Sequence, residues 1–326
     1  MEKPPYQGKL SILESLTPLA KELRSVRIDR EGIIDFCSRI DDSHFPHPRW
    51  DFFFVYPGLD EIGVDYFMLM NALNFCYWGN PKWTVEYRGQ LLDGAFGMFA
   101  ALTRALEEGM PIYDGGWLAG ITRDDLARIL RGRGEIPLFY QRFTICREIG
   151  RILSEKFGGR FHHLVAQAEK SAVKLVRLLV ENFPSFDDSA EWDGYRILFY
   201  KRAQLAPAML YERWEGKGPG AFGDIGEMTA SADYKLPQVL RELGILHYAP
   251  PLEKFVDGRL QIPPGTREEL EIRITTLVAC EMIRERLHDR FPGITSQAVD
   301  RLLWTAGQSG NGPERKPYHL TLTTAY

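Results

Sequence analysis

The chain has 326 residues, 44% of them hydrophobic, so it is long enough to bury a large core and is not expected to be disordered. Its 40 lysine and arginine residues face 44 aspartate and glutamate residues, which gives a net charge of −4. A protein that wraps a nucleic-acid backbone usually has a strong basic excess, so this balance favours a small anionic ligand.

The start of the chain and its cysteines indicate a cytoplasmic protein. No apolar signal region follows Met1, and no window offers the roughly 20 apolar residues that a membrane span needs. The four cysteines are widely spaced and form no C-x-x-C pair, so we expect buried free thiols in a reducing compartment.

Apolar residues recur at helical spacing through most of the chain, for example between Val173 and Val180. We therefore expect an all-α fold. The predicted helices span residues 16–26, 30–40, 64–77, 91–108, 123–131, 139–156, 161–182, 201–214, 237–243, 267–290 and 296–304.

Two of these helices carry start signals in the sequence. Thr122 is followed by Asp124 and Asp125, which indicates an N-cap with acidic residues in the first turn. Thr266 and Glu269 have the spacing of a capping box. Both patterns predict a helix that begins at the next residue.

Strand signals are weak. Only residues 51–56 and 196–200 have strand composition, so at most a small β ribbon is expected. The sequence has no βαβ alternation and no internal repeat. We predict a single globular domain over residues 1–326, with two helical lobes that meet at a central cleft.

The predicted helix over residues 64–77 has Asn74 and Phe75 near its end. An aromatic ring can stack on a flat base while a side-chain amide reads the base edge. Core packing is the alternative for Phe75, whereas a buried Asn74 would need polar partners.

Lys201 and Arg202 follow the apolar run 196–200, so their charges are expected at the edge of the core. Both are candidates for binding a phosphate, Arg202 by paired hydrogen bonds and Lys201 as a point charge. Lys201 could equally pair with Asp233 or bind a sugar, and an ordinary surface pair is the alternative for both. Pro207 is expected to kink or restart the helix that follows.

Asp233 is expected just before a helix. Pro237 lacks an N–H and suits the first turn, while Leu236 before it is pushed toward an extended conformation. A carboxylate at Asp233 would be held by free backbone N–H groups and the helix dipole. A plain helix cap is the alternative.

The histidines do not predict a metal site. His44 and His47 lie in a proline-rich loop, and neither this pair nor His162 and His163 has a cysteine or an acid at zinc-ligand spacing. His47 remains a candidate for lining a ligand pocket.

Four short segments follow one another along the chain: Ala72-Leu73-Asn74-Phe75-Cys76, Tyr200-Lys201-Arg202-Ala203-Gln204, Ala232-Asp233-Tyr234-Lys235-Leu236-Pro237-Gln238 and Glu271-Ile272-Arg273. Together they resemble the queuosine salvage family, whose members are queuosine 5'-phosphate N-glycosylase/hydrolases. The resemblance runs from about Asp65 to Trp304. It implies hydrolysis of the N-glycosidic bond of queuosine 5'-phosphate, releasing queuine and ribose 5-phosphate for queuine salvage, with no cofactor and no metal.

The resemblance also implies roles for single residues. Asp233 matches the acid of the family's Ala-Asp-Tyr-x-x-Pro-Gln motif and is expected to be the catalytic carboxylate, with Lys201 as the second catalytic residue. A carboxylate near C1' can stabilise the positive charge that develops on the sugar, activate water, or attack directly. One carboxylate at a helix start is also the arrangement in helical DNA glycosylases. The expected substrate-binding residues are His47, Asn74, Phe75, Arg202, Tyr234, Lys235, Glu271 and Arg273. For Glu271 and Arg273 the alternative is an ion pair or a buried buttress that holds helices together.

A weaker family pattern matches Asp300 and Trp304, although Thr305 stands where an acid is expected. Two alternatives stay open at this stage. One is a glycosylase that acts on DNA or RNA bases, and the other is a non-catalytic protein that binds a modified nucleotide or tRNA. The charge balance favours a small-molecule substrate over nucleic acid as the main partner.

Overall fold

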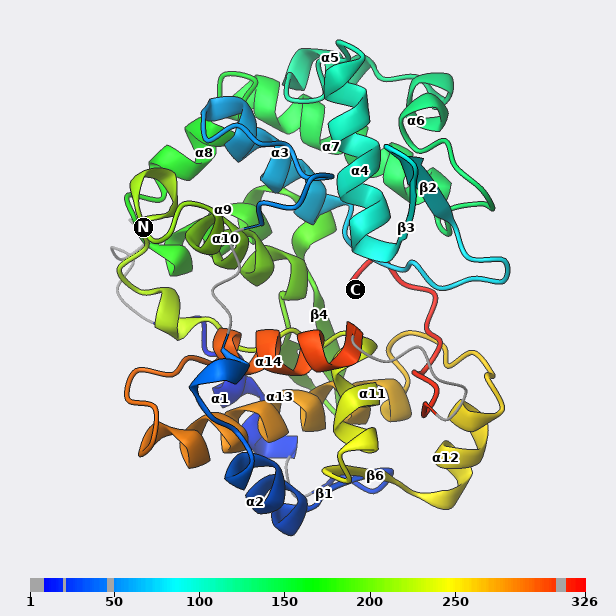
Figure 1. The fold of residues 1–326 in the computed structure, drawn as a ribbon, viewed down its shortest axis with the longest axis vertical. Coiled ribbons are helices and arrows are strands. Elements are labelled where there is room, and N and C mark those ends of the chain that lie inside the picture. Colours follow the sequence, from blue (N-terminus) through cyan, green and yellow to red (C-terminus); the bar gives the residue numbers. More distant parts are fainter. Residues whose placement is uncertain (1–8, 20–21, 46–49, 309–314) are drawn as a thin grey trace.

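The computed structural model describes residues 9–19, 22–45, 50–308 and 315–326, and it confirms a mostly helical architecture (Figure 1). The helices are α1 (Ile12–Leu16), α2 (Arg30–Ser38), α3 (Glu61–Ala72), α4 (Gly94–Glu107), α5 (Gly115–Gly120), α6 (Arg123–Ile129), α7 (Phe139–Lys156), α8 (Phe161–Gln167), α9 (Ala172–Asn182), α10 (Lys201–Arg213), α11 (Lys235–Glu242), α12 (Pro250–Asp257), α13 (Arg267–His288) and α14 (Ser296–Gln308).

The strands of the described residues form three two-stranded antiparallel ribbons. These pair β1 (Val26–Ile28) with β6 (Leu246–Tyr248), β2 (Thr84–Tyr87) with β3 (Gln90–Asp93), and β4 (Ser189–Trp192) with β5 (Tyr195–Leu198). The strand predicted over 196–200 is therefore present as β5. No described helix is both long and apolar enough to cross a membrane.

Figure 1 shows two groups of elements. One group contains α3 to α9 with β2 and β3, and the other contains α1, α2 and α11 to α14 with β1 and β6. Helix α10 packs against α3 and α9, while its first residue points toward the second group. The buried apolar side chains form one connected cluster that includes both groups. The single domain with two lobes stays a prediction.

Two predicted elements near the N-terminus are wrong. Residues 16–26 do not form a helix: α1 ends at Leu16, a 3-10 turn covers Thr17–Leu19, and β1 begins at Val26. Pro18 cannot donate a helical hydrogen bond, and β1 pairs with β6 more than 200 residues away. Residues 51–56 form a turn rather than a strand, since no strand of the described residues pairs with them and the N–H of Val55 donates to the carbonyl of Phe52 at 2.9 Å.

Three predicted helices are divided or start or end well inside their predicted bounds. Residues 161–182 are split into α8 and α9, because Glu169 and Lys170 have φ values of 51° and 65°. Residues 90–93 form β3, so α4 starts only at Gly94. Helix α3 ends at Ala72, and the segment 74–78 leaves it with Cys76 at a φ of 42°. Helix α10, in contrast, continues through Pro207 without restarting.

The two predicted caps have different outcomes. Thr122 and Asp125 form the expected reciprocal capping box at α6. The box predicted for Thr266 and Glu269 is wrong, because the Thr266 hydroxyl donates to a preceding carbonyl. Glu269 instead accepts from the N–H of Gly265 at 3.0 Å and from the buried hydroxyl of Tyr326 at 2.8 Å. All four cysteines are free and buried, as predicted.

Candidate functional site

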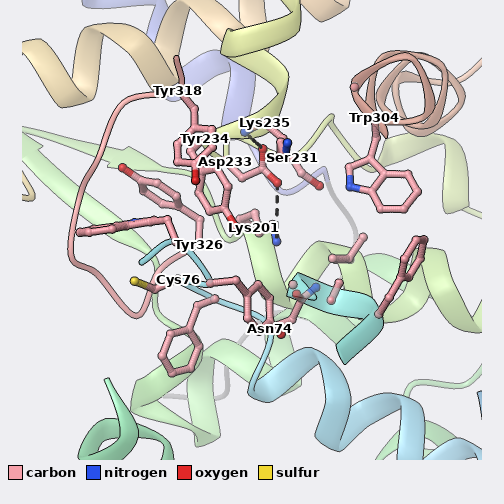
Figure 2. A pocket seen from close by; sticks show the side chains of 18 of the residues that line it. Asn74, Cys76, Lys201, Ser231, Asp233, Tyr234, Lys235, Trp304, Tyr318 and Tyr326 are labelled. Carbon is pink, nitrogen blue, oxygen red and sulfur yellow. Dashed lines mark hydrogen bonds and ion pairs between the residues drawn. The ribbon is translucent and has the colours of Figure 1, made fainter. Parts of the chain in front are cut away.

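A pocket with a cavity of about 170 Å³ lies between the two groups of helices (Figure 2). Its walls come from the segment 74–78 after α3, residues 93–96 at the start of α4, the first turns of α10 and α11, helix α14, and the C-terminal segment 315–326. Since these segments are distant in sequence, the pocket exists only in the folded chain.

Asp233 lies two residues before α11 and points into this pocket. Its Oδ1 accepts hydrogen bonds from the backbone N–H groups of Lys235 at 2.8 Å and Leu236 at 3.2 Å. Pro237 occupies the first turn as predicted, but Leu236 is helical rather than extended. The backbone contacts fix one carboxylate oxygen and leave the other, Oδ2, available to a ligand.

Lys201 is the first residue of α10, and its ammonium lies 4.0 Å from Oδ2 of Asp233. This separation is an ion pair but too long for a direct hydrogen bond. The lysine side chain is buried, and burial lowers its pKa while the charge of Asp233 opposes that effect. The pair therefore presents adjacent opposite charges to the same small volume.

Arg273 on α13 connects the segment that carries Lys201 to the segment that carries Asp233. Its guanidinium makes two hydrogen bonds to the carboxylate of Asp188, at 2.9 and 2.7 Å, and Asp188 in turn accepts the N–H of Lys201 at 3.1 Å. Its Nε donates to the carbonyl of Ala232 at 3.0 Å, one residue before Asp233. Arg273 is buried and does not line the pocket, so the predicted direct contact with substrate is wrong.

Glu271 is also outside the pocket. Its Oε2 accepts the N–H groups of Arg24, Ser25 and Val26, at 2.8, 2.5 and 3.2 Å, and its Oε1 pairs with Arg267 at 3.1 Å. These contacts join α13 to the segment that enters β1. The predicted ligand contact of Glu271 is therefore replaced by a structural one, because the carboxylate faces the N-terminal segment.

Arg202 points away from the pocket as well. Its guanidinium donates to the carbonyls of Ala72 and Ser185 and lies 5.1 Å from the ring centre of Phe75. Burial lowers its pKa to about 10. The prediction that Arg202 binds a phosphate is wrong, because residues 201 and 202 point in different directions at the start of the helix and only Lys201 enters the cavity.

Four other predicted residues line the pocket: Asn74, Phe75, Tyr234 and Lys235. Asn74 and Phe75 do so from the segment after α3 rather than from a helix. The ring of Phe75 is held between Arg202 and the guanidinium of Arg142, which lies 4.1 Å from the ring centre. His47 lies outside the described residues.

The aromatic residues of the pocket gather at its two ends. Tyr234 and Tyr318 pack with ring centres 5.0 Å apart on one side of Asp233. Trp304 lies on the other side and packs edge-on against Phe96 at 5.6 Å. The carboxylate of Asp233 thus lies between two aromatic surfaces.

Asp300 is a pocket residue that the sequence indicated only weakly. It lies one helical turn before Trp304 on the same face of α14, and its Oδ2 accepts the N–H of Ser231 at 2.5 Å. Burial and the nearby negative charge of Asp233 raise its pKa to about 6. The i, i+4 spacing of an acid and an aromatic residue was the available signal, but it does not show which way the face points.

This pKa predicts a stability change on Asp300→Asn. The rise from 3.8 to about 6 means that ionised Asp300 costs on the order of 3 kcal/mol of folding free energy at pH 8. At pH 4 the carboxyl is protonated in the folded state and only about half ionised in the unfolded state, so the cost is small. Asp300→Asn should therefore raise the free energy of unfolding at pH 8 and change it little at pH 4.

Urea unfolding at the two pH values would measure this effect. Asp289→Asn, which neutralises an exposed acid, is the matched control and should show no such pH dependence. If Asp300→Asn destabilises the protein at pH 8, neighbouring groups stabilise the ionised carboxylate, and the raised pKa of Asp300 is refuted.

No group of three histidine, cysteine, aspartate or glutamate side chains with metal-binding geometry occurs in residues 9–19, 22–45, 50–308 and 315–326.

Comparison with known proteins finds a matching family and several similar proteins. A family model described as queuosine salvage protein matches residues 56–326. A Sphaerobacter thermophilus protein named queuosine 5'-phosphate N-glycosylase/hydrolase is 41% identical over 318 residues, covering 98% of each chain. Proteins of the same name from Bos taurus and Mus musculus are 42% and 35% identical, covering 82% and 97% of this chain and 83% and 99% of their own.

Proposed function

The chain belongs to the queuosine salvage protein family, and on that premise we propose that its pocket hydrolyses queuosine 5'-phosphate to queuine and ribose 5-phosphate. The observation that carries this proposal is Asp233, whose Oδ1 is fixed by two N–H groups while its Oδ2 faces the cavity beside Lys201. A carboxylate fixed in this way needs no reorganisation when positive charge develops near it.

In the proposed reaction, the bond between C1' and the ring nitrogen breaks and its electron pair leaves with the base. Oδ2 of Asp233 stabilises the cationic sugar. The oxygen of a water molecule then bonds to C1', and one of its protons ends on the base, so the sum is hydrolysis. Water is the nucleophile, so this reaction needs only one carboxylate.

Queuine is a harder base to release than an ordinary purine. Queuine is a 7-deazaguanine, in which carbon replaces the N7 that is protonated when ordinary purines leave. Hydrogen bonds to the remaining ring atoms must then supply the assistance. We propose that the base lies at the Trp304 end, where Asn74, Ser231 and Asp300 supply polar groups beside an aromatic surface.

Lys201 lies beside Asp233 in the same cavity and has a separate proposed role. We propose that its ammonium orients the carboxylate and hydrogen-bonds the ribose, since it lies 4.0 Å from Oδ2 and lines the same cavity. We further propose that the protein acts in the cytoplasm on the free nucleotide. The net charge of −4 gives a polyanion such as tRNA no general attraction to its surface.

One assay separates this function from its rivals. The purified protein is incubated with queuosine 5'-phosphate, with queuosine, and with intact tRNA that contains queuosine, and free queuine is measured. We expect fast release from the nucleotide, much slower release from the nucleoside and almost none from tRNA. Rapid cleavage of tRNA would indicate a nucleic-acid glycosylase, and binding without release of base would indicate a non-catalytic protein.

A further inference from the structure

We propose that Lys82 and Lys235 together bind the 5'-phosphate of the substrate, at the tyrosine end of the pocket. This inference rests on the proposed function and adds to it the site that distinguishes a nucleotide from a nucleoside. It replaces the pair Lys201 and Arg202, of which only Lys201 reaches the cavity.

The two lysines come from different parts of the chain and line the same pocket. Lys235 is the first residue of α11, two residues after Asp233, and its ammonium lies 5.6 Å from the ring centre of Tyr318. Lys82 lies in the loop before β2, and its ammonium is 3.1 Å from a carboxylate oxygen of Asp93.

The ammonium of Lys235 is poorly satisfied by protein groups. Its one hydrogen bond within the described residues is to the side chain of Gln238 at 3.5 Å, the outer limit for such a contact. Lys235 is half-buried, so its ammonium has lost part of its hydration, which a ligand with strong acceptors can replace. A phosphate presents three strong acceptor oxygens.

The charges around the two lysines are positive in sum. Burial lowers the pKa of Lys235, and the charges of Lys82 and Arg315 lower it further, against the opposing carboxylates of Asp233 and Asp93. The charge of Asp233 is already paired with that of Lys201, so Asp93 is the carboxylate that faces the two ammonium groups of Lys82 and Lys235. A dianionic phosphate would remove this repulsion.

The remaining cations of the pocket wall are committed elsewhere. Lys201 pairs with Asp233, and Arg301 pairs with Glu212 while lying over the ring of Trp50 at 4.6 Å. Arg301 also belongs to the tryptophan end, where the proposed function places the base. Lys82 is paired as well, with Asp93, but both side chains of that ion pair are exposed, so it is weak. Lys82 and Lys235 are therefore the pocket cations near Tyr318 that can turn to a phosphate.

Neutral donors accompany the lysines. Tyr318 packs against Tyr234, and burial raises the pKa of both phenols, so each hydroxyl keeps its proton and can donate. The substrate then lies with its phosphate at the tyrosine end, its ribose at Asp233 and its base at the Trp304 end (Figure 2). This order along the pocket matches the order of groups in a nucleotide.

The proposal predicts a loss of activity that depends on the phosphate. Lys235→Met and Lys82→Met should each lower kcat/KM for queuosine 5'-phosphate by about 10- to 100-fold, in the range expected for one charge-assisted contact, and change kcat/KM for queuosine less than about 3-fold. Lys254→Met, which changes an exposed lysine on α12, is the matched control and should leave both values unchanged.

A binding measurement keeps this test independent of catalysis. Calorimetry with ribose 5-phosphate should show affinity at least 10-fold weaker for the Lys82→Met/Lys235→Met double variant than for the wild type, and ribose should bind both equally. Equal losses with queuosine and its 5'-phosphate, or unchanged binding of ribose 5-phosphate, would overturn the assignment of the lysines. Failure of the wild type to release queuine while the calorimetric difference persists would instead overturn the proposed reaction and leave the anion site standing.

Discussion

Asp233→Asn should lower the rate of queuine release by about 10³-fold or more while the protein still folds and binds queuosine 5'-phosphate. The amide keeps the shape of the side chain, and its oxygen can still accept the N–H groups of Lys235 and Leu236. The negative charge that faces C1' is lost. Single-turnover measurement of released queuine gives the rate, and calorimetry gives the affinity.

The control for this variant is Asp289→Asn, which removes one negative charge from an exposed position outside the pocket and should retain full activity. A circular dichroism spectrum and an unfolding curve like those of the wild type would show that Asp233→Asn is folded. Queuine release at a rate near that of the wild type would refute the role of Asp233, because no other change in the pocket compensates for the missing charge.

Arg273→Met should lower the free energy of unfolding by about 3–5 kcal/mol, since it leaves the buried carboxylate of Asp188 without its cation. The same change releases the carbonyl of Ala232, so Asp233 is no longer held in place. We therefore expect kcat to fall as well, with a smaller change in KM, because Arg273 holds the segments of the proposed catalytic residues Lys201 and Asp233 and does not line the pocket.

Two comparisons separate stability from positioning in this variant. Arg39→Met, which breaks an exposed ion pair with Asp35, should cost less than about 1 kcal/mol. The double variant Asp188→Asn/Arg273→Met should recover part of the lost stability, since Asp188 no longer carries a buried unpaired charge, without recovering kcat. The recovery is partial because buried Glu269 also loses its pair with Arg273. Full recovery of kcat in the double variant would show that Arg273 has only a structural role.

Much of the helical architecture could be predicted because apolar periodicity is a local signal. The helices over 123–131 and 139–156 have bounds close to those of α6 and α7, and the cap at Thr122 is made by residues three apart. The wrong elements depended on distant partners. Residues 26–28 form a ribbon with β6, and the acid of the predicted cap at Thr266 accepts a hydrogen bond from Tyr326.

The sequence by itself determined the class of the fold and the place of Asp233 before a helix that contains Pro237. Spacing along one helix start fixes which N–H groups reach a carboxylate, so these features are local. The 4.0 Å approach of Lys201 to Asp233 came from tertiary structure, since the two residues lie at the starts of different helices. Tertiary structure alone decided that Arg202 and Arg273 face buried partners, while Lys82, Asp300 and Trp304 enter the pocket. The direction of a side chain depends on which segment packs against it, and here those segments lie far apart in the chain.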